Sequence, residues 1–267
     1  MDWSKAKNVL IILFLLLNGF LAIYLFMFYG IDSSKKNIGN TENILIERGY
    51  TLETRIPNIK NGYKLKYENV EFDRNLIAQQ LLETQGINDK INENESFQRG
   101  SKSLTFLSKN SFVYIDNEPK QIININEKAN AEKYVKEVLD KLKLPYIDLY
   151  LDAYEFNNDK SITLTFTEKY NKYLIFDNNA KVTVTDKGIT SMNCKFVKVK
   201  GFETNKIDII PAYQILLREF LKGSNGVIIS IDLGYESFIE NATKESSNNP
   251  VWRIKLKDGT QRIYKSK

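Results

Sequence analysis

The residues best placed for acid–base chemistry are two aspartates in one expected strand. Asp148 and Asp152 fall on one face of residues 147–156, together with Tyr150 and Tyr154. Two carboxylates on one face can exchange protons with a substrate. The same alternation describes an ordinary strand with a solvated face, and we favour that interpretation over a catalytic one.

Other catalytic chemistries lack their residues. The chain has no histidine and one cysteine, Cys194, so a Ser-His-Asp triad, a Cys-His pair and the usual zinc sites are all incomplete. Cys194 lies in the alternating segment 192–196, which predicts a small buried side chain rather than a reactive thiol. We therefore expect no catalytic residue, no metal and no cofactor, and we do not expect an enzyme.

Basic residues gather near the C-terminus and form a candidate basic surface. Arg253, Lys255 and Lys257 alternate on one face of an expected strand, and Arg262 follows on the next. Such a surface could bind an anionic wall polymer, lipid headgroups or an acidic partner. A charged outer face that protects an edge strand explains the pattern equally well.

Composition indicates a folded protein that does not bind nucleic acid. Of the 267 residues, 42% are hydrophobic and 27% are charged, which is ordinary for a globular chain. The formal net charge is +5, without the dense basic clusters of a nucleic-acid binder.

The elements that hold these residues follow an unbroken apolar run, residues 9–29, whose only polar member is Asn18. At about 1.5 Å per residue a helix of this length matches a hydrocarbon core of about 30 Å. Trp3, Lys5 and Lys7 precede it and would anchor its end at the membrane interface. A cleaved signal peptide is the alternative, but the run is long and ends in bulky residues where a cleavage site needs small ones.

Topology and domain boundaries follow from this anchor. We expect a cytoplasmic head at residues 1–8, a transmembrane helix at 9–29 and a polar tether at 30–43. Two extracytoplasmic α+β segments would then cover residues 44–120 and 121–267. Lysines flank both ends of the helix, so the orientation depends on the short head remaining inside.

A patch within the expected membrane helix could contact a second helix. Leu15, Asn18, Gly19 and Ala22 lie close together by i+3 and i+4 spacing. Small residues with one amide are typical of helix contacts in lipid, where a polar contact contributes about 1 kcal/mol. The alternative is an asparagine that the membrane tolerates without a partner.

The remainder predicts an α+β fold of antiparallel sheets, each packed by a helix. Helices are expected from Asp73 as a cap, from Asn126 as a cap, and over residues 209–222. Turns are expected at Lys109-Asn110, Asn178-Asn179 and Asp186-Lys187-Gly188. The second segment holds two helix-plus-sheet units, which resemble the small binding and inhibitory units of the PepSY type.

The most specific local signal is the last hairpin. Residues 252–256 and 261–264 alternate around Asp258-Gly259, the pair preferred in a two-residue type I′ turn.

The two ends of the chain carry a family resemblance. The opening Met1-Asp2-Trp3-Ser4-Lys5 runs directly into a single apolar helix with a central asparagine, and a Lys- and Asn-rich domain follows. The closing Pro250-Val251-Trp252-Arg253-Ile254 is followed by Asp258-Gly259. In these features the chain resembles the YycI (WalI) family of bitopic membrane proteins of low-GC Gram-positive bacteria.

The resemblance implies a regulatory role. Members of that family work with a YycH-like protein and contact the sensor histidine kinase WalK (YycG), whose signalling governs cell-wall metabolism. It therefore implies a single-pass protein of the cell membrane with those two partners. Two other functions remain open: a surface module that binds anionic wall polymer, and a PepSY-like inhibitor of an exported hydrolase.

Overall fold

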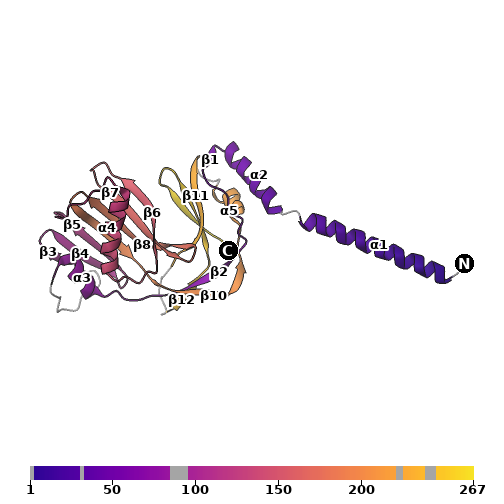
Figure 1. Ribbon diagram of the computed structural model, residues 1–267, viewed down its shortest axis with the longest axis horizontal. Coiled ribbons are helices and arrows are strands. Elements are labelled where there is room, and N and C mark those ends of the chain that lie inside the picture. Colours follow the sequence, from indigo (N-terminus) through magenta and orange to yellow (C-terminus); the bar gives the residue numbers. More distant parts are fainter. Residues whose placement is uncertain (1–2, 31–32, 85–95, 221–224, 238–244) are drawn as a thin grey trace.

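A long N-terminal helix projects from a folded body (Figure 1). The computed structural model describes residues 3–30, 33–84, 96–220, 225–237 and 245–267. Helix α1, Trp3–Gly30, is about 42 Å long at 1.5 Å per residue. Its segment Ala6–Tyr24 is long and apolar enough to cross a membrane, and none of it is buried against the body.

Helix α2, Ser33–Glu47, begins within the polar tether expected at residues 30–43, so residues 33–43 are helical. Ser34, Thr41 and Leu45 are buried, and Ile38 packs against the same core. These four positions share one helical face, so α2 is amphipathic although its composition is polar. The sequence pattern was missed because two of the four buried side chains are hydroxyls.

The strands confirm the α+β class. Within the described residues, eleven strands form one sheet whose main path is β14-β13-β11-β8-β9-β5-β4-β3, with β7 and β6 added beside β8 and β1 beside β11. Most neighbours are antiparallel, but β1 and β8 each run parallel to β11. The sheets are antiparallel as expected except at these two contacts.

One half of the body, here called the α4 half, has its core on the helix-covered face of the sheet (Figure 1). Its helices are α3, Arg74–Leu82, and α4, Lys128–Lys141. Its strands are β3 Ser96–Arg99, β4 Lys102–Ser108, β5 Ser111–Asp116, β6 Leu149–Phe156, β7 Ile162–Tyr170, β8 Tyr173–Thr185 and β9 Gly188–Lys195.

The two caps in this half differ in outcome. Asp73 caps α3 as expected, since its carboxylate accepts the Leu76 N–H at 3.0 Å. The expected cap of α4 is wrong by one residue, because the residue before the helix is Glu127 rather than Asn126. The Glu127 side chain makes no capping hydrogen bond.

The other half, here called the α5 half, has its own core around Leu216 and Trp252. Its helix α5, Ala212–Arg218, starts later than expected, after Pro211, whose fixed φ suits a helix start. Its strands are β1 Tyr50–Leu52, β11 Gly226–Tyr235, β13 Val251–Leu256 and β14 Gln261–Lys265. Helix α2 packs on this half through contacts with β1 and α5.

A second, three-stranded sheet lies below the junction of the halves in Figure 1. It consists of β10 Lys198–Asp208, β2 Asn61–Glu68 and β12 Glu245–Asn248. Leu65, Val199 and Tyr235 pack there with Ile175 of β8 as a small third core. The segment 44–120 is thus divided among all three parts, and β5 pairs with β9 across the expected boundary at 120/121.

One predicted turn is absent and another is confirmed. Strand β8 runs without interruption through Asn178-Asn179, and its partner β7 shifts register between Thr167 and Glu168. The turn at Asp186-Lys187 is present, because Thr185 pairs with Gly188.

The last hairpin is present, but not with a two-residue type I′ turn. The Gly259 N–H bonds the Leu256 carbonyl, and the Leu256 N–H bonds Thr260. Gly259 has φ +87, whereas Asp258 is not among the non-glycine residues with positive φ. A type I′ turn needs positive φ at both central residues, so this is a longer turn that ends in a left-handed glycine.

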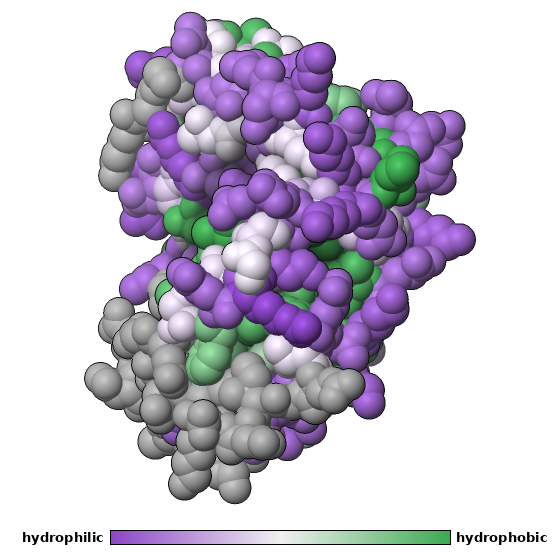
Figure 2. All heavy atoms as spheres, turned by 90° about the vertical axis from the view of Figure 1, so that its left-hand side faces the viewer, coloured by the Kyte–Doolittle hydropathy of each residue, from purple (hydrophilic) through white to green (hydrophobic). Residues whose placement is uncertain are grey.

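The end of the body farthest from α1 is mainly hydrophilic, with scattered hydrophobic side chains (Figure 2). Among the described residues, most of the exposed large hydrophobic side chains lie on α1.

Candidate functional site

The expected contact patch lies on the open surface of α1. Leu15 is 65% exposed, and a Cβ at Gly19 would meet no atom within 4 Å. The Asn18 side-chain amide donates to the Phe14 carbonyl at 3.0 Å. That bond uses one of two amide protons, so the second proton and the side-chain oxygen can still bond a neighbouring helix. Ala22 is exposed on the same side.

The interface anchors are described in part. Trp3 is 84% exposed and Lys7 is exposed, as an anchor in the headgroup region requires. The side chain of Lys5 lies outside the described residues.

The two candidate aspartates differ in their exposure to solvent. Asp148 is exposed before β6, whereas the Asp152 side chain is only 8% exposed. A register shift between Leu151 and Ala153 also turns Tyr154 inward, where it packs against the core beside Leu151. The expectation of a solvated face is therefore wrong for Asp152 and Tyr154.

The Asp152 carboxylate instead joins the two halves of the body. Arg253 Nη1 and Nη2 donate to its two oxygens at 2.5 and 3.0 Å, and Arg253 Nη2 also reaches Asp232 at 2.9 Å. The guanidinium lies over the Phe176 ring, 4.3 Å from its centroid. Arg253 is 2% exposed and does not belong to an exposed basic surface.

The other members of the predicted basic surface have separate environments. Lys255 bonds Asp152 at 2.8 Å, and its side chain is 16% exposed. Lys257 is exposed and pairs with Glu53 at 2.7 Å. Arg262 lies over the Phe220 ring. These side chains do not form the continuous basic face that simple alternation predicts.

Electrostatics keep the junction charged. Burial alone would raise the pKa of Asp152, but its hydrogen bonds and attraction to Arg253 and Lys255 outweigh burial and hold that pKa below its ordinary value. The junction thus contains buried ionised groups that pair with one another, so the loss of one partner would leave an uncompensated buried charge.

A second buried polar cluster lies where β7 shifts register against β8. Glu168 is fully buried and accepts hydrogen bonds from Asn178 at 2.6 Å and from the Ile147 N–H at 3.1 Å. Burial raises the pKa of Glu168 to about 7. Asn178 also bonds both backbone groups of Val197 and the Ser237 hydroxyl.

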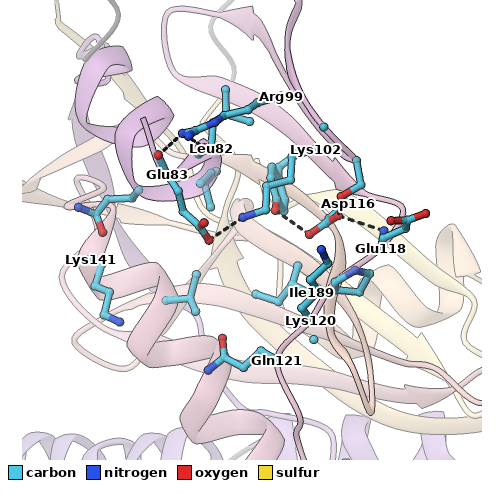
Figure 3. Close-up of a pocket in the computed structure, with 18 of the residues that line it drawn as sticks. Leu82, Glu83, Arg99, Lys102, Asp116, Glu118, Lys120, Gln121, Lys141 and Ile189 are labelled. Carbon is cyan, nitrogen blue, oxygen red and sulfur yellow. Dashed lines mark hydrogen bonds and ion pairs between the residues drawn. The ribbon is translucent and has the colours of Figure 1, made fainter. Parts of the chain in front are cut away.

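A cavity of about 760 Å³ lies in the α4 half (Figure 3). Lys102 pairs with Glu83 at 2.7 Å, and Arg99 donates to the carbonyls of Leu82 and Glu83 at the end of α3. Lys141, Gln121 and Lys120 lie along the opposite wall. The polar lining is of mixed charge.

Asp116, which also lines the cavity, already has hydrogen-bond partners. It accepts the Ser101 hydroxyl at 2.7 Å and the Glu118 N–H at 3.1 Å. The Asp116 carboxylate is thus held by a side-chain hydroxyl and a backbone N–H.

The described residues contain neither a candidate metal site nor an exposed thiol. No group of three or more His, Cys, Asp or Glu residues there could hold a metal ion. Cys194 is buried on β9, and burial raises the pKa of its thiol.

Comparisons with known proteins give a family and a fold. The family model described as YycI protein matches residues 30–266. A crystal structure of an uncharacterized protein from Eubacterium rectale ATCC 33656 is similar with a TM-score of 0.50 and 11% identity, over 85% of this chain and 96% of that chain. YycH from Bacillus subtilis is similar with a TM-score of 0.52 and 13% identity, over 80% of this chain and 54% of that chain. Both likenesses concern the fold alone, and a comparison with curated proteins finds no match.

Proposed function

The chain belongs to the YycI family, and on that basis we propose that it is a membrane-anchored regulator of a WalK-type sensor histidine kinase. The N-terminus would be cytoplasmic, and the body would lie outside the membrane with a YycH-like partner. Association with the kinase would shift it between signalling states, and so adjust the control of cell-wall metabolism.

The docked α2 is the observation that most supports this mechanism. A regulator must link events in its body to its membrane helix, and a flexible tether would transmit little. Here α2 begins three residues after α1 ends and buries Leu45 in the core of the α5 half. Strand β1 follows directly and pairs with β11 in the main sheet. A change in the body could therefore alter the direction in which α1 leaves it.

The membrane part of the proposal uses the patch on α1. We assign contact with kinase helices to Leu15, Asn18, Gly19 and Ala22, because they combine small side chains with a polar amide on an unpacked helix. Trp3, Lys5 and Lys7 would hold the inner end at the interface.

The body would associate with the YycH-like partner. The junction of the halves is a candidate responsive element, because β8 and β11 pair there through only two residue pairs, Gly234 with Leu174 and Tyr235 with Ile175. The buried Arg253–Asp152 pair crosses the same junction.

Crosslinked purification of the full-length protein from its own membranes tests the proposal. We expect a sensor kinase and a YycH-like protein to copurify. Asn18→Leu removes the amide and Gly19→Leu fills the space beside it, so both should reduce kinase recovery about fivefold or more, in line with a loss of about 1 kcal/mol.

Leu13→Phe is the matched control, because it adds bulk to the opposite side of α1. It should leave kinase recovery unchanged. If the wild-type protein recovers neither partner, the regulatory proposal is wrong. If the wild-type protein and the Asn18→Leu variant recover both partners equally, only the assignment of the patch is wrong.

A further inference from the structure

The outer face of α2 carries two lysines close to the membrane helix. Ser34, Ile38 and Leu45 face the body, which places Lys35 and Lys36 on the sides away from it. Both lysines are exposed. Among the described residues, neither makes an ion pair with an acid, whereas Lys255 and Lys257 do.

The charges along α2 oppose its dipole. A helix N-terminus carries partial positive charge and is stabilised by acidic residues, and its C-terminus by basic ones. In α2 the first turn holds Lys35 and Lys36 and no acid, and the last turn holds Glu47 and no base. A negatively charged surface beside the first turn would offset this arrangement.

The chain itself places such a surface within reach. Lys35 follows the last residue of α1, Gly30, by five positions, which span at most about 18 Å even when extended. The headgroup region of a bilayer is about 5–8 Å thick on each side, and charges act over a Debye length of about 8 Å. A lysine side chain can extend its ammonium group toward that region.

We propose that Lys35 and Lys36 bind the phosphates of anionic lipid headgroups on the side of the membrane where α1 ends. This contact would hold α2 between the bilayer and the α5 half, with one face on each. The inference rests on the membrane anchor of the proposed function, but it concerns a separate ligand, the lipid surface.

Energy transfer from α2 to the lipid surface tests the inference on the full-length protein. A fluorophore on Asn40→Cys would report from the exposed side of α2, and the buried Cys194 should remain unlabelled. The acceptor is a headgroup-labelled lipid in vesicles of phosphatidylcholine, alone or mixed with phosphatidylglycerol. Transfer should be higher in the mixed vesicles and fall toward the neutral value at high salt.

Lys35→Glu/Lys36→Glu should abolish the difference between the two lipids. Each lysine near an anionic surface changes the ratio of bound to free states about fivefold, so the pair should change it about 30-fold. Lys181→Glu/Lys187→Glu makes the same charge change at exposed sites of the α4 half and should retain the difference.

Equal transfer in both lipids, or full transfer in Lys35→Glu/Lys36→Glu, overturns the inference while leaving the anchor intact. Vesicle flotation is measured on the same samples. Protein that does not float with either vesicle has no working anchor, which overturns both this inference and the proposed function.

Discussion

Arg253 on β13 donates two hydrogen bonds to Asp152 on β6, across 101 residues of chain. Both side chains are almost fully buried, at 3% and 8% exposure. Each buried charge has lost its hydration, so its stability in the folded protein depends on the pairing with the other.

Asp152→Ala should lower the free energy of unfolding by about 3–5 kcal/mol, because it leaves a buried guanidinium without its main partner. Urea denaturation measures the loss. Asp148→Ala, four residues earlier and exposed, should cost less than about 0.5 kcal/mol. Asp152→Leu/Arg253→Met removes both charges and should cost less than the sum of the single changes; simple additivity would contradict the coupling.

Glu168 should make stability depend on pH near neutrality. Its folded pKa of about 7 lies above the ordinary 4.5, so the folded protein retains a proton that the unfolded chain releases. The free energy of unfolding should therefore fall as the pH rises from about 4.5 to about 7, by at most about 3 kcal/mol.

Glu168→Gln should flatten that slope in denaturation measured across this pH range. Burial also raises the pKa of Glu236, which contributes a slope of the same sign, so the difference between wild type and variant is the quantity to compare. Identical slopes would show that the pKa of Glu168 is the same in the folded and the unfolded protein.

Leu45→Ala should release α2 from the body. Leu45 is fully buried, and truncation of such a leucine costs about 2–5 kcal/mol. Amide hydrogen exchange should show loss of protection in residues 33–47 before the rest of the body. Ile46→Ala, at a 61% exposed neighbour, should leave exchange nearly unchanged; equal effects of the two would contradict the docked face.

Two glycines should respond oppositely to alanine. A Cβ at Gly234 would overlap the Leu174 carbonyl and the Phe176 ring, so Gly234→Ala should destabilise the protein by about 1–3 kcal/mol. A Cβ at Gly39 in α2 meets nothing within 4 Å, so Gly39→Ala should stabilise it by up to about 1 kcal/mol. Thermal unfolding of both variants tests the contrast.

Local patterns predicted the elements whose causes are local. The spacing of apolar residues indicated α3 and α4, and Asp73 acts as the expected cap because its partner is three residues away. The final hairpin followed from Asp258-Gly259, although its turn is longer than expected.

Features that depend on distant residues could not be predicted in this way. Alternation placed Arg253 on a solvent-exposed face of its strand. Asp152 and Phe176, which lie on strands more than 70 positions earlier, instead bury its side chain. Asn178-Asn179 has the composition of a turn, yet Glu168 and Val197 satisfy the Asn178 amide inside the sheet.

Strand β1 pairs with residues 226–228, and β2 with β10 and β12. In the described part of the chain, the strands nearest the membrane helix thus find their sheet partners only after residue 197. During synthesis these early strands cannot pair until most of the chain has been made. Contacts between residues so far apart in the sequence also slow folding. The first strands therefore gain their sheet partners late, and truncation before residue 198 would leave both β1 and β2 without them.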